Sequence, residues 1–205
     1  MTEAMKQNYP PNLLPKNGQV YYFGKLLNEA EAEDFFELLL KEVSWKHDEV
    51  MIFGRKITTA RKTAWYGDKE FEYTYSKMTK KAMLWLPELA LLRQKVEQET
   101  ALVFNSCLLN LYHSGEEGMS WHSDAEAELG RQPAIASVSL GAERKFVLKH
   151  KQTGEKLELQ LEQGSLLLMA GETQTHWLHS LPKTKKVKEP RINLTFRNIK
   201  KWKTP

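Results

Sequence analysis

The sequence predicts a mainly β fold with flanking helices (α+β), arranged as a sandwich or jelly roll. After Leu102 seven short β-rich runs follow one another: SCLLNLY, AIASVSL, RKFVLKH, KLELQLE, SLLLMA, HWLHSL and RINLTFRNI. Turn signals such as Ser114-Gly115, Thr153-Gly154 and Gln163-Gly164 separate several of these runs. Helical patterns occur only before them, so the helices are expected to pack outside the strands.

An extended lead-in and two helices are expected ahead of the β-rich region. Residues 1–18 are rich in Pro and Asn and predict an extended segment. A helix is expected from Asn28 to about Val43, because Asn28 and Glu31 form a capping-box pattern. Its apolar face would be formed by Phe35, Leu38, Leu39 and Val43. A second helix should begin at Pro87, a residue suited to the first helical position, and run through LALLRQKVEQET.

The strands differ in their expected burial. KLELQLE alternates between apolar and polar residues, which predicts a half-buried strand, whereas AIASVSL and SLLLMA predict buried ones. The chain of 205 residues is expected to form one domain, 1–205, with its β core at 102–200.

The segment 50–77 between the helices has an unusual composition. Aromatic residues alternate with basic ones there: Phe53, Trp65, Tyr66, Phe71, Tyr73 and Tyr75 with Arg55, Lys56, Arg61 and Lys62. One interpretation is a hairpin whose aromatic side chains complete the core. The other is a lid that stacks on nucleic-acid bases and contacts phosphates.

Charge and cysteine content suggest an intracellular protein with an anionic partner. The net charge is +4 and the pI about 9.0, and nine Lys or Arg residues lie between Lys183 and Lys203 against one acid, Glu189. Such a run is either a solvated surface or a track for phosphates. Cys107 is the single cysteine, which fits a reducing compartment, and its apolar surroundings in SCLLNLY predict a core position. No secretory signal or membrane-spanning stretch is recognisable, so we expect a cytoplasmic protein if bacterial and a nuclear one if eukaryotic.

A candidate metal site combines His122, Asp124 and a third, more distant histidine. His122 and Asp124 are separated by one residue, so on an extended segment both side chains point to one face. Either His176 or His179 could supply the third ligand. Because they are three residues apart they face opposite ways on a strand, and periodicity alone leaves the choice open.

This ligand set favours oxidative rather than hydrolytic chemistry. Two imidazoles and one carboxylate occupy one face of an octahedral metal and leave the other open, as in non-heme Fe(II) oxygenases. Arg191 and Arg197 lie in one strand-like run, and guanidinium groups bind the carboxylates that a dicarboxylate co-substrate carries. The main rival is a hydrolytic zinc site, but a helical His-Glu-x-x-His or a Cys-rich set is absent.

These residues belong to a longer pattern. The run NLYHSGEEGMSWHSDAEAEL…IASVSLGAERKFVLKH…GSLLLMAGETQTHWLHSLP…EPRINLTFRNI resembles the AlkB family of Fe(II)/2-oxoglutarate-dependent nucleic-acid dealkylases, most closely its duplex-DNA repair branch. The resemblance covers roughly residues 50–200. It implies a double-stranded β-helix, a form of jelly roll, with a nucleotide-recognition lid at 50–77.

The resemblance also implies roles at the metal and at the co-substrate. The family histidine precedes Ser-Leu-Pro, which makes His179 the third ligand and His176 a structural residue. Residues expected to bind 2-oxoglutarate are Asn110, Tyr112, Arg191, Asn193, Thr195 and Arg197. The last four alternate along one strand and so share a face. We assign Arg191 to the distal carboxylate and Arg197 to the metal-proximal end.

Substrate contacts are implied in the lid and beside the metal. Phe53-Gly54-Arg55 matches a hairpin that inserts an aromatic wedge into the duplex where the damaged base leaves the stack. Tyr73-Thr74-Tyr75 matches the strip that lines the base pocket, and Glu126 matches an acid that contacts the edge of the base. Ala125 departs from the pattern, since some relatives carry a second acid there.

The activity implied is that of a DNA repair dioxygenase using Fe(II), 2-oxoglutarate and O2. It would hydroxylate the methyl group of 1-methyladenine or 3-methylcytosine, which is then released as formaldehyde. The partner would be double-stranded DNA and the enzyme a monomer. The alternatives are an RNA demethylase of the same family and a non-catalytic nucleic-acid-binding module on the same fold.

Overall fold

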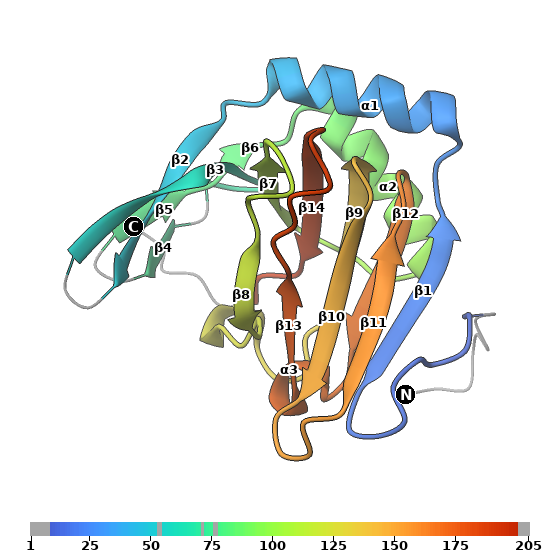
Figure 1. Cartoon of the computed structure of the whole chain (residues 1–205). Helices are drawn as coiled ribbons and strands as arrows, with labels where there is room; N and C mark the ends of the chain where they lie inside the picture. The colour runs from blue at the N-terminus through green and yellow to red at the C-terminus, as the bar shows by residue number, and fades with distance from the viewer. Residues whose placement is uncertain (1–8, 53–54, 71, 76–77, 201–205) are drawn as a thin grey trace.

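The computed structural model describes residues 9–52, 55–70, 72–75 and 78–200, with the side chains of 48–57 and 71–80 left out of the description. Two long helices, α1 (Glu29–Glu42) and α2 (Pro87–Thr100), lie on one side of the β structure (Figure 1). A short helix, α3 (Thr173–His176), and a 3-10 turn, η1 (Ala127–Leu129), lie at the opposite end of the strands. Among the described helices, none is long and apolar enough to cross a membrane.

The strands form a large sheet, a four-stranded sheet and a separate hairpin. The eight-stranded sheet has the order β1-β12-β9-β14-β7-β3-β2, with β6 paired to β3. Its members are β1 (Gln19–Lys25), β2 (Lys46–Ile52), β3 (Arg55–Gly67), β6 (Met83–Leu84), β7 (Ser106–Tyr112), β9 (Ile135–Gly141), β12 (Ser165–Ala170) and β14 (Arg191–Arg197). The four-stranded sheet, in the order β11-β10-β13-β8, comprises β8 (Met119–His122), β10 (Arg144–His150), β11 (Lys156–Leu161) and β13 (Trp177–Leu181). The hairpin pairs β4 (Glu72–Tyr75) with β5 (Met78–Lys81).

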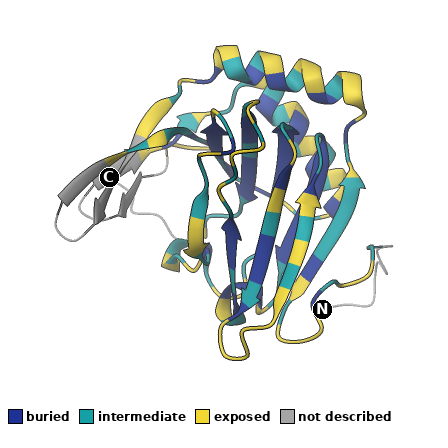
Figure 2. Ribbon diagram, viewed as in Figure 1, coloured by how far each residue is buried: buried dark blue, intermediate teal, exposed yellow. Residues whose placement is uncertain are grey.

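Alternation along the central strands separates an apolar face from a polar one. Ile192, Leu194 and Phe196 of β14 belong to the hydrophobic cluster that also holds the buried residues of α1 and α2. The other residues of β14, including Arg191 and Asn193, point to the opposite face, because successive side chains of a strand alternate. The helices therefore cover the apolar face of the large sheet. Figure 2 shows the central strands mostly in the dark blue of buried residues.

The second hydrophobic cluster joins the two sheets. It contains Ile135 and Leu167 from the large sheet together with Leu148, Leu161 and Trp177 from the small one. The sheets thus pack face to face around part of their inner surfaces, and the predicted mainly β sandwich is confirmed. The polar residues of β14 face the remainder of this inter-sheet space.

Both predicted long helices are confirmed. Asn28 caps α1, with its side chain accepting from the Glu31 backbone N–H and the Glu31 carboxylate accepting from the Asn28 N–H. Pro87 is the first residue of α2. The predicted apolar face of α1 is only partly right. Leu39 and Val43 are buried, but Phe35 and Leu38 are only partly covered, and Phe36 is buried instead. The helix is rotated slightly because it packs against β9, where Phe36 fits beside Gly141.

All seven predicted β-rich runs contain strands. Five further strands complete the two sheets: β1, β2, β3, β6 and β8. β1 pairs with β12 despite a register shift at Tyr22/Gly24, which interrupts the alternation by which a strand is recognised. β8 pairs with β13. β3 pairs with β7 over Lys62–Gly67, so the large sheet draws on residues outside 102–200.

Most of the described residues in the segment 50–77 lie in strands. Its strand β3 extends from a pairing with β2 into the large sheet, where Tyr66 is 2% exposed and belongs to the core. The aromatic side chains therefore do not all have one role, since Tyr66 at least completes the core. Phe53 and Gly54 lie outside the described residues, as do the side chains of Arg55 and of Tyr73, Thr74 and Tyr75.

Candidate active site

The small sheet brings His122 and His179 together. The two residues are paired partners on the antiparallel strands β8 and β13, and their imidazole rings are 4.2 Å apart, centre to centre. Asp124 follows β8, and its Oδ2 lies 4.0 Å from Nε2 of His179. One ligand atom from each of the three residues lies within 4.8 Å of the other two. These three residues form the one His/Cys/Asp/Glu group of this kind within the described part of the chain.

Neighbouring groups hold two of the three side chains in orientations that suit a metal ligand. His122 Nδ1 lies 2.8 Å from the carbonyl oxygen of Ser120. A carbonyl only accepts hydrogen bonds, so Nδ1 carries the hydrogen and Nε2 is the nitrogen left for a metal. Arg197 Nη2 is 3.0 Å from Oδ1 of Asp124, so Oδ2 is the oxygen left toward the histidines. His179 is 5% exposed, and its ring also contacts Phe146.

The electrostatics favour the protonation states that bind metal. Burial lowers the pKa of His179 to about 4, so its imidazole is neutral at physiological pH. Burial opposes the ionisation of Asp124, yet the charge of Arg197, with His179 and His122, brings its pKa below the usual value. A neutral imidazole and an ionised carboxylate are the forms that coordinate a cation.

A polar surface on the large sheet faces this cluster. It is built from alternate residues of three adjacent strands: Asn110 and Tyr112 on β7, Ser137 and Ser139 on β9, and Arg191, Asn193, Thr195 and Arg197 on β14. The strand register places Asn193 opposite Asn110 on one side and Ser139 on the other. Asn193 accepts hydrogen bonds from Ser137 Oγ at 3.0 Å and Arg191 Nη2 at 2.9 Å, and donates to Thr195 Oγ1 at 2.8 Å.

Arg191 is a buried cation without a carboxylate partner among the described residues. It is 2% exposed, it donates from Nη2 to Ser139 Oγ and Asn193 Oδ1, and its Nε has no partner. Burial lowers its pKa to about 10. A buried guanidinium hydrogen-bonded only to neutral groups carries an uncompensated charge. It is therefore suited to bind an anion such as a carboxylate of 2-oxoglutarate.

Arg197 and Glu126 lie at the metal end of the same surface. Arg197 Nη1 is 3.6 Å from Oε1 of Glu126, while its Nη2 contacts Asp124. Burial opposes the charge of Arg197, but Asp124 and Glu126 outweigh it and its pKa is raised. Burial also raises the pKa of Glu126, with Asp124 acting in the same direction and Arg197 against it. Glu126 Oε2 has no partner, so it remains available to a ligand.

The structure brings most of the predicted site residues together and adds others. His176 ends α3 and stacks against His150, so it is not part of the metal cluster. Ser137, Ser139 and Gln174, which donate or accept at the site, were not predicted. The alternating serines of AIASVSL could have signalled a polar face, whereas nothing local marks Gln174.

A comparison with protein families matches residues 19–197 to the 2OG-Fe(II) oxygenase superfamily. Among curated proteins, the chain is 43% identical over 185 residues to DNA oxidative demethylase ALKBH2 of Bos taurus, covering 85% of this chain and 66% of that protein. It is 42% identical to ALKBH2 of Homo sapiens over 185 residues, covering 85% and 71%. The chain belongs to the AlkB family of 2OG-Fe(II) oxygenases.

Another AlkB relative agrees with this placement. Two solved structures share the fold of the chain. Alpha-ketoglutarate-dependent dioxygenase alkB homolog 3 of Bos taurus is 41% identical over 179 residues, covering 82% of this chain and 62% of that protein. The chain thus spans about two thirds of the length of these relatives. The structure of OsALKBH1 superimposes with a TM-score of 0.61 at 15% identity, covering 92% of this chain and 100% of that one. A 2OG-Fe(II) oxygenase family protein from Burkholderia pseudomallei gives 0.57 at 12% identity, covering 91% and 86%.

Membership of the AlkB family indicates both the fold and the cofactors. The fold is the jelly roll of the 2OG-Fe(II) oxygenases, as predicted. The cofactors are Fe(II) with 2-oxoglutarate and O2 as co-substrates. The donor set fits them, because two imidazoles and a carboxylate suit Fe(II). The unpaired Arg191 and the partnerless Asn110 Oδ1 fit a polar, dianionic co-substrate beside the metal cluster.

Proposed function

We propose that this AlkB protein is a DNA repair dioxygenase that oxidatively demethylates N-alkylated bases, with 1-methyladenine and 3-methylcytosine as its substrates. One observation carries the proposal: His122 clusters with the buried Asp124 and His179. Asp124 contacts Arg197 of β14, the strand that also holds Arg191, a buried cation hydrogen-bonded only to neutral groups. The identity to proteins named DNA oxidative demethylase supports DNA as the substrate.

Each residue of the site has a proposed part. His122, Asp124 and His179 would hold Fe(II), which with 2-oxoglutarate and O2 supplies the oxidant for an unactivated C–H bond. Arg191 would bind the distal carboxylate of 2-oxoglutarate, with Asn193, Thr195, Asn110 and Tyr112 along its length. Arg197 would orient Asp124 and lie near the metal-proximal end of the co-substrate.

The reaction replaces a methyl hydrogen of the base by a hydroxyl group. The second oxygen atom of O2 goes to 2-oxoglutarate, which leaves as succinate and CO2. The N-hydroxymethyl base then loses formaldehyde, and the nitrogen regains its unmodified form. The protein's part is to bind, to orient and to keep water away from the reacting groups.

Glu126 supports cationic bases as the preferred lesions. Its Oε2 is buried and unpartnered beside the metal cluster, and 1-methyladenine and 3-methylcytosine carry a positive charge. A carboxylate therefore attracts them more than it attracts neutral bases. We propose that Phe53, Gly54 and Arg55 insert into duplex DNA and that Tyr73, Thr74 and Tyr75 line the base pocket, on the sequence resemblance alone.

We further propose one catalytic domain over 1–205, with a lead-in at 1–18, a nucleotide-recognition lid at 50–77 and the β-helix core at 102–200. We expect it to act as a monomer on double-stranded DNA inside the cell, in the cytoplasm of a bacterium or the nucleus of a eukaryote. The single, buried Cys107 is consistent with a reducing compartment.

The decisive experiment supplies Fe(II), 2-oxoglutarate and ascorbate with DNA or RNA oligonucleotides that carry one methylated base. Formaldehyde and succinate should form in equal amounts, fastest on double-stranded DNA. His179→Ala should abolish turnover, whereas His176→Ala should retain it, because only His179 lies in the metal cluster. Equal loss in both variants would refute the ligand assignment. Faster turnover of RNA would favour the RNA demethylase, and binding without formaldehyde would favour a non-catalytic module.

A further inference from the structure

Asp124 lies outside the regular strands. β8 ends at His122 and η1 begins at Ala127, so the four residues between them have no strand partner. The position of the Asp124 carboxylate therefore depends on contacts other than sheet hydrogen bonds. Arg197 supplies one of these contacts, at the carboxylate itself.

A second contact holds the Asp124 backbone. The backbone N–H of Asp124 donates to Oε1 of Gln174 at 2.9 Å, across a sequence separation of 50 residues. Gln174 is 3% exposed. Glutamine is mostly exposed in proteins, and a buried amide must be hydrogen-bonded to compensate for its lost hydration. At the other end of its side chain, Nε2 contacts Met169 Sδ at 3.6 Å.

The helix that carries Gln174 is itself fixed. Thr173 is 1% exposed, and its hydroxyl oxygen accepts from the backbone N–H of Gln19 at 2.8 Å. Lys151 Nζ donates to the Gln174 carbonyl at 2.9 Å and lies 3.4 Å from Ser123 Oγ. Gln174 is therefore a fixed point against which residues 123–124 are held.

We propose that Gln174 is a positioning residue for the metal-binding carboxylate of Asp124. This proposal rests on the proposed function, in which His122, Asp124 and His179 hold Fe(II). Without the Gln174 acceptor, the Asp124 N–H is left buried and unsatisfied, and the loop must shift to reach another acceptor or water. Any such shift moves the Asp124 carboxylate relative to the two histidines, which stay fixed on paired strands.

The metal alone tests this role. Gln174→Met keeps the volume of the side chain but removes the oxygen acceptor, and Mn(II) affinity is measured by calorimetry without co-substrate or DNA. Affinity should fall by about 10-fold or more, as is usual when a group supporting a metal ligand is lost. Met169→Leu is the matched control, since it removes the other contact of the Gln174 side chain. It should bind Mn(II) within about two-fold of wild type, because Met and Leu are similar in volume.

A second measurement separates positioning from damage to the fold. In the demethylation assay, the Fe(II) concentration for half-maximal activity should rise about 10-fold in Gln174→Met, because the displaced carboxylate binds the metal more weakly. Misfolding would lower maximal turnover without changing the Fe(II) requirement. Gln174→Glu retains an oxygen acceptor and should bind Mn(II) no more weakly than wild type.

The outcomes distinguish the two proposals. If the wild-type protein binds no Mn(II) or Fe(II), the proposed function fails. If wild type binds the metal and Gln174→Met binds it as tightly as Met169→Leu does, the proposed function stands and the role of Gln174 is refuted. Equal weakening in Gln174→Met and Gln174→Glu would also refute it, because the acceptor is then not the cause.

Discussion

Arg191 and Arg144 are both buried, but their partners differ. The guanidinium of Arg144 donates to the backbone carbonyls of Ser114, Gly115, Glu117 and Pro182 at 2.8–3.2 Å. Among the described residues Arg191 has only two acceptors, both of them neutral side chains. The Nε of each arginine has no hydrogen-bond partner there. The first arginine therefore stabilises loops of the fold, whereas we propose that the second binds a carboxylate of 2-oxoglutarate.

This contrast predicts opposite effects of the same substitution. Arg191→Met should leave the stability of the ligand-free protein within about 1 kcal/mol of wild type, since it removes an uncompensated charge. It should weaken 2-oxoglutarate binding about 100-fold, the loss expected for charge-assisted hydrogen bonds. Arg144→Met should instead cost about 3 kcal/mol or more by leaving buried carbonyls unpaired. Urea unfolding would measure the stability of each variant, and calorimetric titration with Mn(II) present would measure its affinity for 2-oxoglutarate. Equal changes in affinity for Arg191→Met and Arg144→Met would contradict the assignment of Arg191.

A pH dependence follows from His179 in the metal-free protein. Its pKa is about 4 in the folded state, against 6.5 as the ordinary value. Between these values the unfolded chain binds a proton that the native protein does not, so stability should fall as pH drops from 6.5 to 4.

Below pH 4 His179 is protonated in both the folded and the unfolded state, so its contribution to the free energy of unfolding no longer changes with pH. His179→Gln should reduce the loss of stability over this window by about 3 kcal/mol, measured by urea unfolding in EDTA. An unchanged pH slope would show that His179 is not a buried neutral histidine.

Sequence patterns identified many of the residues at this site, for physical reasons. Alternation in RINLTFR predicted four polar side chains on one face. In β14 the three apolar residues belong to the hydrophobic cluster. The polar residues contact one another and Asp124. Gln174 escaped prediction because its role depends on a contact across 50 residues. The choice between His176 and His179 required the family pattern, since spacing alone treats them alike.

At the level of elements, local signals predicted helix boundaries better than sheet membership. The Asn28 cap and Pro87 are recognisable from adjacent residues alone, and both helices begin where predicted. β1 and β3 join the large sheet through partners far along the chain. No local pattern encodes such pairings, so the extent of the sheet became clear only from the structure.

The turn between the sheets depends on Gly141. This residue ends β9 with φ +78°, and an added Cβ would lie 2.6 Å from the Pro190 carbonyl oxygen and 2.7 Å from Phe36. Gly141→Ala should therefore cost about 2 kcal/mol or more, combining left-handed strain with displacement of its neighbours.

Gly154→Ala is the matched control for Gly141→Ala. Gly154 has φ +73°, but nothing lies within 4 Å of its added Cβ. It should cost only about 1 kcal/mol from backbone strain. Thermal or urea unfolding of both variants would compare them, and an equal loss would show that packing against α1 and Pro190 is unimportant.

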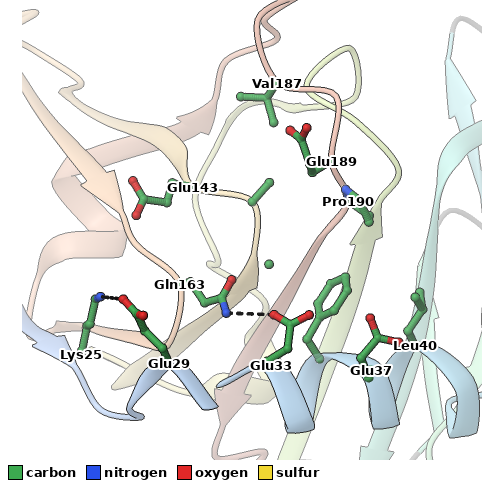
Figure 3. Close-up of a pocket in the computed structure, with 13 residues that line it drawn as sticks. Lys25, Glu29, Glu33, Glu37, Leu40, Glu143, Gln163, Val187, Glu189 and Pro190 are labelled. Carbon is green, nitrogen blue, oxygen red and sulfur yellow. Dashed lines mark hydrogen bonds and ion pairs between the residues drawn. The ribbon is translucent and has the colours of Figure 1, made fainter. Parts of the chain in front are cut away.

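Over the whole molecule, charge is unevenly distributed. A pocket of about 920 Å³ between α1 and residues 187–190 is lined by five glutamates and one lysine: Glu29, Glu33, Glu37, Glu143, Glu189 and Lys25 (Figure 3). The segment leading from β13 into β14 carries exposed Lys183, Lys185, Lys186 and Lys188. A polyanion is therefore repelled from the pocket and attracted to the lysines of this segment.

The salt dependence of DNA binding tests whether these lysines contact phosphates. Each phosphate contact releases counterions and contributes about 0.9 to the slope of log K against log salt concentration. Replacing Lys185 and Lys186 by Ala should reduce that slope by about 2 if both lysines contact phosphates. The control is Lys41→Ala with Lys95→Ala, which removes the same charge from α1 and α2 and should leave the slope unchanged. Both double variants lose the same net charge, so a smaller slope in the Lys185/Lys186 variant alone would report phosphate contacts and not charge. Equal slopes in wild type and the Lys185/Lys186 variant would show that these lysines do not contact phosphates.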